Sequence, residues 1–158
     1  MGDEAQHADD FDATFQSSLA RLQVGIETAC ASEDDWAAKV LAGVRAALAF
    51  AAANPAAAEA LTNEAMAGGR EGFAQYDRMI EHFAEALRPG RAAQPSGEYL
   101  PEITEKTMVG GLAMLIAQRL SLGRHADLPA LAPGATQFVL TPYLGTTEAR
   151  KVAFGDPG

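Results

Sequence analysis

The sequence is poor in the residues that build β-strands. Valine and isoleucine are sparse, whereas alanine is very abundant. Because β-branched residues favour strands and alanine is the strongest helix former, this composition favours helices. No stretch alternates apolar and polar residues with a period of two, which is the pattern of a half-buried strand. The sequence therefore predicts an all-α fold.

Cysteine and long hydrophobic runs are also scarce. The single cysteine, Cys30, excludes an internal disulfide and is compatible with a reducing compartment. The first ten residues, MGDEAQHADD, are acidic and polar, which is the opposite of a signal peptide. The longest apolar run, residues 46–53, is too short to span a bilayer. We therefore expect a cytoplasmic protein that does not contact a membrane.

Basic residues are fewer than acidic ones. The chain has 12 basic and 21 acidic residues, which gives a formal net charge of −9. An acidic domain repels phosphate backbones, and no local basic cluster reverses that repulsion. The sequence predicts no direct nucleic-acid binding by this chain alone.

Recognisable catalytic and metal-binding motifs are absent. The chain has no G-x-S-x-G, Walker loop, H-E-x-x-H or C-x-x-C sequence. Its three histidines, His7, His82 and His125, are far apart in the sequence. We expect no catalytic residues, no metal and no cofactor. An enzyme is the least favoured alternative, and its acid or base would come from Glu64, Asp77, Glu81 or His82.

The apolar periodicity predicts a bundle of about six or seven helices. Spacings of three and four residues place Phe15, Leu22 and Ile26 on one face of the first expected helix. The same spacings predict an apolar stripe on the second helix, made of Trp36, Val40, Val44, Ala47 and Ala51. We expect a frayed or disordered tail over residues 1–10, one domain over residues 11–154 and a second tail over residues 155–158. Proline, glycine and serine over residues 90–100 predict a mobile loop. The expected helices cover about residues 12–31, 33–53, 55–66, 70–87, 102–122, 133–144 and 146–153.

Bulky, adaptable side chains are distributed over several of these helices, and small residues fill much of the space between them. Pockets for apolar ligands in helical bundles have this composition, with a few polar groups that orient the ligand. An ordinary hydrophobic core is the alternative at each position. The candidate ligand-binding residues are Phe15, Trp36, Met66, Phe73, Tyr76, Met79, His82, Phe83 and Met108.

The helix expected over residues 102–122 is apolar nearly all round. Such a helix must be covered on two sides, and a second copy of the chain would cover one of them. Gly110 and Gly111 each cost about 1 kcal/mol relative to alanine in a helix interior, and close approach of another backbone would compensate. A monomeric bundle with a buried central helix is the alternative. The candidate dimer-interface residues are Val109, Gly110, Gly111, Leu112, Leu115, Phe138, Leu140 and Tyr143.

Three segments resemble a known family. They are DDWAAKVLAGVRAALAF with the following Asn54-Pro55, then MVGGLAMLIAQRL, and then FVLTPYLGTTEA. Together with the order of the helices, they are similar to the C-terminal regulatory domain of TetR/AcrR-type transcriptional repressors. The resemblance covers roughly residues 11–153.

The resemblance implies a specific architecture and function. In that family the C-terminal domain binds a small ligand, and its last two long helices pair two copies in a four-helix interface. Here those helices correspond to residues 102–122 and 133–144. The implied function is that of a ligand-sensing, homodimeric domain for a small, mostly apolar molecule.

The sequence departs from the family pattern at its N-terminal end. The helix-turn-helix domain that reads operator DNA in that family is missing, so this chain alone should not bind DNA. An excised domain, a truncated reading frame and a natural headless variant all fit the sequence. The alternative function is a free-standing helical protein that binds a hydrophobic small molecule or a partner helix.

Overall fold

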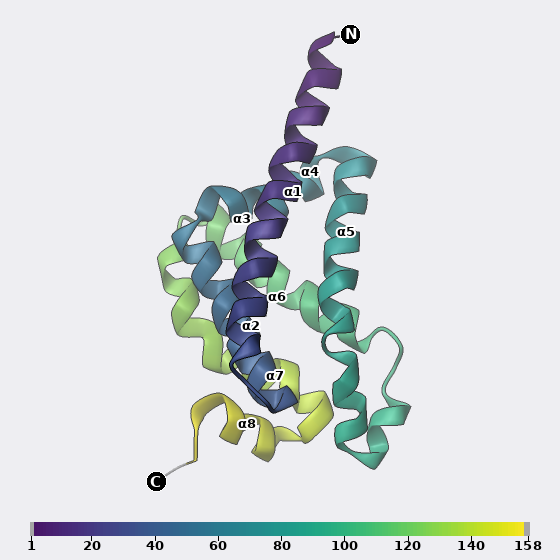
Figure 1. The fold of residues 1–158 in the computed structure, drawn as a ribbon, viewed down its shortest axis with the longest axis vertical. Helices are drawn as coiled ribbons and strands as arrows, with labels where there is room; N and C mark the ends of the chain where they lie inside the picture. The colour runs from purple at the N-terminus through teal and green to yellow at the C-terminus, as the bar shows by residue number, and fades with distance from the viewer. Residues whose placement is uncertain (1, 157–158) are drawn as a thin grey trace.

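The computed structural model describes residues 2–156, and these residues form helices and the turns between them (Figure 1). The prediction of an all-α bundle is confirmed. Eight α-helices, α1 to α8, and three 3₁₀-helices, η1 to η3, make up this described part of the chain. The expected helix over residues 55–66 is two short helices rather than one.

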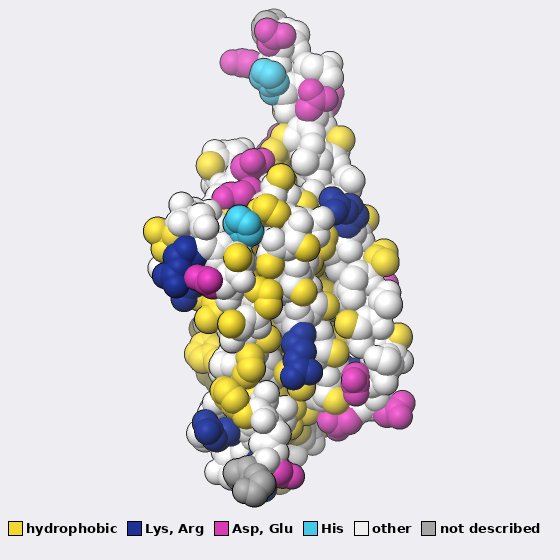
Figure 2. Space-filling view, turned by 90° about the vertical axis from the view of Figure 1, so that its left-hand side faces the viewer, with side chains coloured by type: hydrophobic (Ala, Val, Ile, Leu, Met, Phe, Trp, Pro, Cys, Tyr) yellow, Lys and Arg dark blue, Asp and Glu magenta, His cyan; other side chains and the backbone are white. Residues whose placement is uncertain are grey.

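The first helix is longer than predicted. α1 spans Gly2–Ala31, and its N-terminal part projects beyond the bundle (Figure 1). A frayed tail over residues 1–10 was expected; residues 2–10 are instead helical, and residue 1 lies outside the described residues. Asp3 and Glu4 in the first turn favour a helix N-terminus, and the helix extends from its packed part near Phe15. Acidic side chains gather on this projecting end (Figure 2).

Caps and breaks explain the next three helices. α2 spans Trp36–Ala53, and the carboxylate of Asp35 accepts a hydrogen bond from the Ala38 amide at 3.1 Å, which caps its N-terminus. α3 (Pro55–Leu61) begins with proline in its first turn. α4 (Asn63–Ala67) follows a break at Thr62, whose hydroxyl donates to the Ala58 carbonyl at 2.8 Å.

The second half of the chain contains one long connection. α5 spans Gly69–Glu85 and α6 spans Thr104–Ser121. Where a mobile loop was predicted between them, the chain forms η1 (Arg88–Ala93) and η2 (Pro95–Tyr99). This segment is therefore ordered by its contacts with the bundle, described below.

The C-terminal helices follow the prediction closely. η3 (His125–Leu131) leads into α7 (Ala132–Leu144), and α8 covers Thr146–Phe154. Gly145, at φ 79°, reverses the chain between α7 and α8 in a backbone conformation that favours glycine. Of the tail predicted over residues 155–158, Gly155 and Asp156 are not helical, and residues 157–158 lie outside the described residues.

Two apolar clusters hold the bundle together. One joins α2, α6, η3, α7 and α8 around Leu48, Leu128 and Leu140. The other joins α1, α3, α5 and α6 around Phe15 and Ile80. α2 and α6 contribute side chains to the region where these clusters meet.

α2 is the one helix in the described part of the chain that is long and apolar enough to cross a membrane. It nevertheless includes Lys39 and Arg45, and it packs against α1, η3 and α7. A core helix of a bundle passes the same test of length and composition, so this property is weak evidence for a membrane span.

Candidate functional site

An apolar cavity of about 330 Å³ lies between the helices. α1, α2, α3, α5, α6 and α7 all contribute to its wall. Leu22 and Ile26 come from α1, Phe83 from α5 and Val109 from α6. A cavity of this kind between helices is a typical place for a small ligand in a bundle.

The cavity exists because α2 presents small side chains to α1. Gly43 and Ala47 of α2 line the wall. A Cβ added at Gly43 would lie 3.5 Å from the Cys30 sulfur and 3.6 Å from Ile26 Cγ2. These are ordinary van der Waals distances, so the glycine leaves space that a larger side chain would fill.

The uncharged polar groups in the wall already have partners within the chain. The Trp36 indole Nε1 donates to the Ala86 carbonyl at 3.1 Å. The Thr62 hydroxyl donates to Ala58 as described, and the Cys30 thiol donates to the Lys39 carbonyl at 3.3 Å. Burial raises the pKa of Cys30, and the nearby Lys39 charge partly opposes that rise. A ligand in the interior therefore meets mainly apolar surface.

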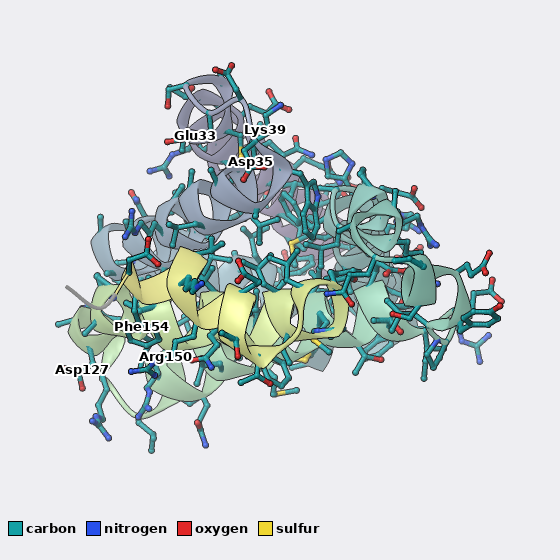
Figure 3. The ribbon with its side chains drawn as sticks, turned by 90° about the horizontal axis from the view of Figure 1, so that it is seen from below. Glu33, Asp35, Lys39, Asp127, Arg150 and Phe154 are labelled. Carbon is teal, nitrogen blue, oxygen red and sulfur yellow. The ribbon has the colours of Figure 1, made fainter. Side chains whose placement is uncertain are left out.

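Lys39 is the charged side chain of the wall, and it is exposed to solvent. It lies at the α1–α2 turn with Glu33 and Asp35 (Figure 3). Within residues 2–156, its ammonium group forms no ion pair; the lysines that do are Lys106 and Lys151. The cavity thus combines an apolar interior with one positive charge at its edge.

The structure brings together three of the nine candidate ligand-binding residues, namely Trp36, Met79 and Phe83, in the cavity wall. The other six lie outside that wall. Phe15 and Tyr76 are buried in the cluster of α1, α3, α5 and α6, and Phe73 and His82 are exposed. Met66 packs on the same cluster as Phe15, and Met108 packs on the cluster around Leu48.

Sequence reasoning missed several wall residues for which a signal existed. The apolar stripe predicted for the second helix lines the cavity along its length, through Trp36, Val40, Val44, Ala47 and Ala51. Leu22 and Ile26, from the apolar face predicted for the first helix, line the cavity as well. Helical spacing therefore indicated the wall residues better than side-chain size did. For Lys39, the sequence contained no comparable signal.

A buried polar network lies beside the cavity. Glu105, in the first turn of α6, is fully buried. Its carboxylate accepts hydrogen bonds from Arg91 Nη2 at 2.8 Å and from the Tyr143 hydroxyl at 2.7 Å. Arg91 also donates to the carbonyls of Leu100 and Pro101 at 2.8 and 2.7 Å. These bonds attach η1 to the N-terminus of α6 and to α7.

The network shifts the acidity of its members. Burial alone would raise the pKa of Glu105, but hydrogen bonds from Arg91 and Tyr143 and the Arg91 charge hold that pKa below its ordinary value. Burial and the Glu105 carboxylate raise the pKa of Tyr143. Glu105 is therefore an ionised, fully partnered carboxylate at neutral pH.

Trp36 borders both the cavity and the polar network. Its ring packs edge-on against Tyr143, with centroids 5.3 Å apart. A Cβ added at Gly90 would overlap the Trp36 ring, so η1 approaches the ring as closely as glycine permits. Trp36 therefore contacts both the cavity and the tyrosine that binds Glu105.

Seven of the eight candidate dimer-interface residues divide into three groups, and Gly110 lies on the open face of α6. Gly111, Leu115 and Phe138 line a shallow groove between α6 and α7, together with Gly134 and Ala135. Val109 and Leu112 line the internal cavity, and Leu112 borders the groove as well.

Leu140 and Tyr143 do not fit the predicted interface. They are 0% and 1% exposed, so they are packed inside their own chain. The prediction that they contact a second copy of the chain directly is therefore corrected. α7 turns these side chains toward α2, and sequence periodicity does not specify which neighbour a helix face meets.

The outer face of α6 and α7 is unfilled within the chain. An added Cβ at Gly110 or Gly134 would meet no atom within 4 Å, and one at Gly111 would meet only Phe138 Cε1 at 4.0 Å. Met114 and Phe138 are 53% and 55% exposed. In one copy of the chain, no neighbouring helix compensates for the glycines of α6.

Two acidic residues of α5 pair with a lysine of α6. Asp77 and Glu81 accept from Lys106 of α6 at 2.8 and 3.1 Å. The exposed His82 ring packs edge-on against Phe83. Among residues 2–156, no three His, Cys, Asp or Glu side chains are grouped closely enough to hold a metal ion.

Comparison with protein-family models, with curated proteins and with solved structures gives no match to this chain. Function is therefore inferred from its own residues and their arrangement.

Proposed function

We propose that this chain is the ligand-binding and dimerisation domain of a TetR-type transcriptional regulator. The apolar cavity between α1, α2, α5 and α6 is the observation that supports this proposal most strongly. Its volume is within the range of about 300–1,000 Å³ that ligand pockets occupy. Its uncharged polar groups are already hydrogen-bonded, so a small apolar molecule can enter without leaving a buried donor or acceptor unpaired.

Pairing of two copies through α6 and α7 is the second part of the proposal. The open glycines and the exposed Met114 and Phe138 support it. Small residues on both helices allow close approach of a second backbone, while the two large side chains supply apolar area to bury. The resulting interface would be a four-helix arrangement with α6 and α7 from each copy.

Trp36 suggests how ligand binding is coupled to pairing. A ligand that contacts the Trp36 ring also acts on Tyr143 of α7 and, through its hydroxyl, on Glu105 of α6. A ligand shifts the arrangement of these helices only if it binds two arrangements with different affinity. In a protein that also contains DNA-binding domains, the arrangement of α6 and α7 would set their separation.

The net charge of −9 supports indirect rather than direct action on DNA by this chain. We place the protein in the cytoplasm, as a homodimer that needs no cofactor and acts as a sensor rather than an enzyme. A free-standing binding protein would have the same cavity without the pairing.

Self-association is tested by measuring the molar mass of the purified chain in solution. We expect twice the chain mass of 16.5 kDa. Gly111→Leu should give the single-chain mass, because its side chain enters the groove. Gly25→Leu is the matched control: it is a helical glycine on α1, and an added Cβ there meets no atom within 4 Å.

Two results would count against this proposal. A single-chain mass for the unmodified protein, at all concentrations, would exclude pairing and leave the binding-protein function. Unchanged hydrogen exchange in α6 and α7 after a cavity ligand has bound would exclude the coupling through Trp36.

A further inference from the structure

We propose that the cavity binds an apolar monocarboxylate, with its hydrocarbon body inside and its carboxylate beside Lys39 at the α1–α2 turn. This inference rests on the proposed ligand-binding function and narrows it to one chemical class.

The interior of the cavity excludes ligands with polar groups along their length. The side chains of Trp36, Thr62 and Cys30 already donate hydrogen bonds to backbone carbonyls. A hydroxyl or amide in the middle of a ligand would therefore lose its water without gaining a partner, which is costly. The ligand that fits has an apolar body and keeps any polar group at one end.

Lys39 specifies the charge of that end. Lys39 belongs to the cavity wall and is exposed to solvent, so its ammonium group stays hydrated near the edge of the apolar space. The carboxylate of Asp35, at the same turn, accepts a hydrogen bond from the Ala38 amide, and neither Asp35 nor Glu33 forms an ion pair with Lys39. The Cys30 thiol, which lines the cavity, donates to the Lys39 carbonyl at 3.3 Å, so the Lys39 backbone lies at the cavity wall.

The acidity of the whole chain makes this local charge decisive. A net charge of −9 disfavours binding of any anion. A carboxylate therefore binds more tightly than a neutral counterpart only if a nearby cation outweighs the general repulsion. Removal of Lys39 should then reverse the preference, so that the neutral compound binds better.

The size of the cavity limits the length of the hydrocarbon. At about 330 Å³ it is near the lower end of the range for ligand pockets. Decanoate is a suitable probe, and 1-decanol is its neutral counterpart of nearly equal length.

The chain has its own reporters for the experiment. Its one tryptophan and its one cysteine both line the cavity, so Trp36 fluorescence and the alkylation rate of Cys30 report on occupancy without labels. Decanoate and 1-decanol are each titrated into the full chain at neutral pH.

We expect decanoate to bind about fivefold more tightly than 1-decanol, as for an exposed ion pair. Lys39→Met should weaken decanoate binding by more than this factor and leave 1-decanol unchanged. Lys39→Arg should retain the preference. Lys151→Met, which removes an exposed lysine from α8, is the control for net charge. Salt at about 1 M should reduce the preference, because it screens exposed charges.

The outcomes separate this inference from the proposed function. If 1-decanol binds as well as decanoate, or if Lys39→Met changes neither affinity, the cavity binds ligands but the carboxylate assignment is wrong. If neither probe changes Trp36 fluorescence or Cys30 alkylation, both the assignment and the ligand-binding function are wrong.

Discussion

The cavity and the Glu105 network are two interior regions of one bundle with opposite properties. The cavity is apolar and incompletely filled, whereas the network is charged and fully paired. An apolar space of this size accepts another molecule, because no buried polar group has to find a new partner. A carboxylate with three hydrogen-bonding contacts from Arg91 and one from Tyr143 accepts only the arrangement that provides them.

The difference indicates a division of roles. The network fixes η1, α6 and α7 relative to one another, while the space between α1, α2 and α5 remains adaptable. Trp36 contacts both regions. Its indole N–H donates to the Ala86 carbonyl, and its ring packs against Tyr143. Substitutions in either region test whether this separation is real.

The largest expected effect is in the network. Glu105→Ala leaves the Arg91 guanidinium largely buried without its carboxylate, and we expect a loss of about 3 kcal/mol in the free energy of unfolding. Urea denaturation measures it. Glu148→Ala removes the exposed partner of Lys151, outside the network, and should cost less than about 0.5 kcal/mol. Equal losses in the two variants would contradict a special role for the buried network.

The second effect is at the boundary between the regions. Gly90→Ala places a methyl group against the Trp36 ring, and we expect a loss of about 2 kcal/mol from overpacking. A shift in Trp36 fluorescence should accompany the lower melting temperature. Gly25→Ala, where an added Cβ meets nothing and which lies outside the proposed interface, should cause neither change. An unshifted Trp36 emission in Gly90→Ala would show that the ring is not held by η1.

A smaller effect concerns pH. The pKa of Glu105 is lowered by folding, so its contribution to stability is fully present above the ordinary carboxyl pKa and is lost as the pH falls through the folded-state value. Glu105→Gln lacks this contribution. The gap in unfolding free energy between the two proteins should therefore narrow from neutral pH toward about pH 3 in urea titrations. A constant gap would mean that Glu105 is not ionised in the network.

The smallest effect is in the cavity. Gly43→Ala improves helix propensity and meets its neighbours at ordinary distances, so we expect a gain of about 0.5–1 kcal/mol in unfolding free energy. Because the methyl group narrows the cavity, decanoate affinity should fall at the same time. Gly25→Ala should give a similar gain in stability with unchanged affinity. A Gly43→Ala protein that binds decanoate normally would argue against ligand binding next to Gly43.

The sequence predicted the positions of the helices better than it predicted the residues of the cavity wall. The stripe of Trp36, Val40 and Val44 was recognised from spacing, and it lines the cavity. Phe15 and Tyr76 were chosen for size and chemistry, and both belong to a filled cluster instead. A cavity is the space that neighbouring side chains leave unfilled, so it depends on six helices together and not on the size of any one residue.

The connection between α5 and α6 shows the same limit. Its glycine and proline content predicted a mobile loop, yet Arg91 within it binds Glu105, which is 14 residues away. This buried ion pair, with three contacts from Arg91 to the carboxylate, outweighs the local preference for flexibility. Nothing in the spacing of these two residues indicates that they meet.

The sequence by itself determined the all-α class, the approximate helices and the apolar face of most of them, because propensity, capping and a period of 3.6 residues are local properties. Tertiary structure decided which faces oppose each other, that Lys39 stands at the edge of an apolar cavity, and that Glu105 is buried between Arg91 and Tyr143. These depend on how the helices cross, and a residue's partner on another helix is set by that packing rather than by its neighbours in the chain.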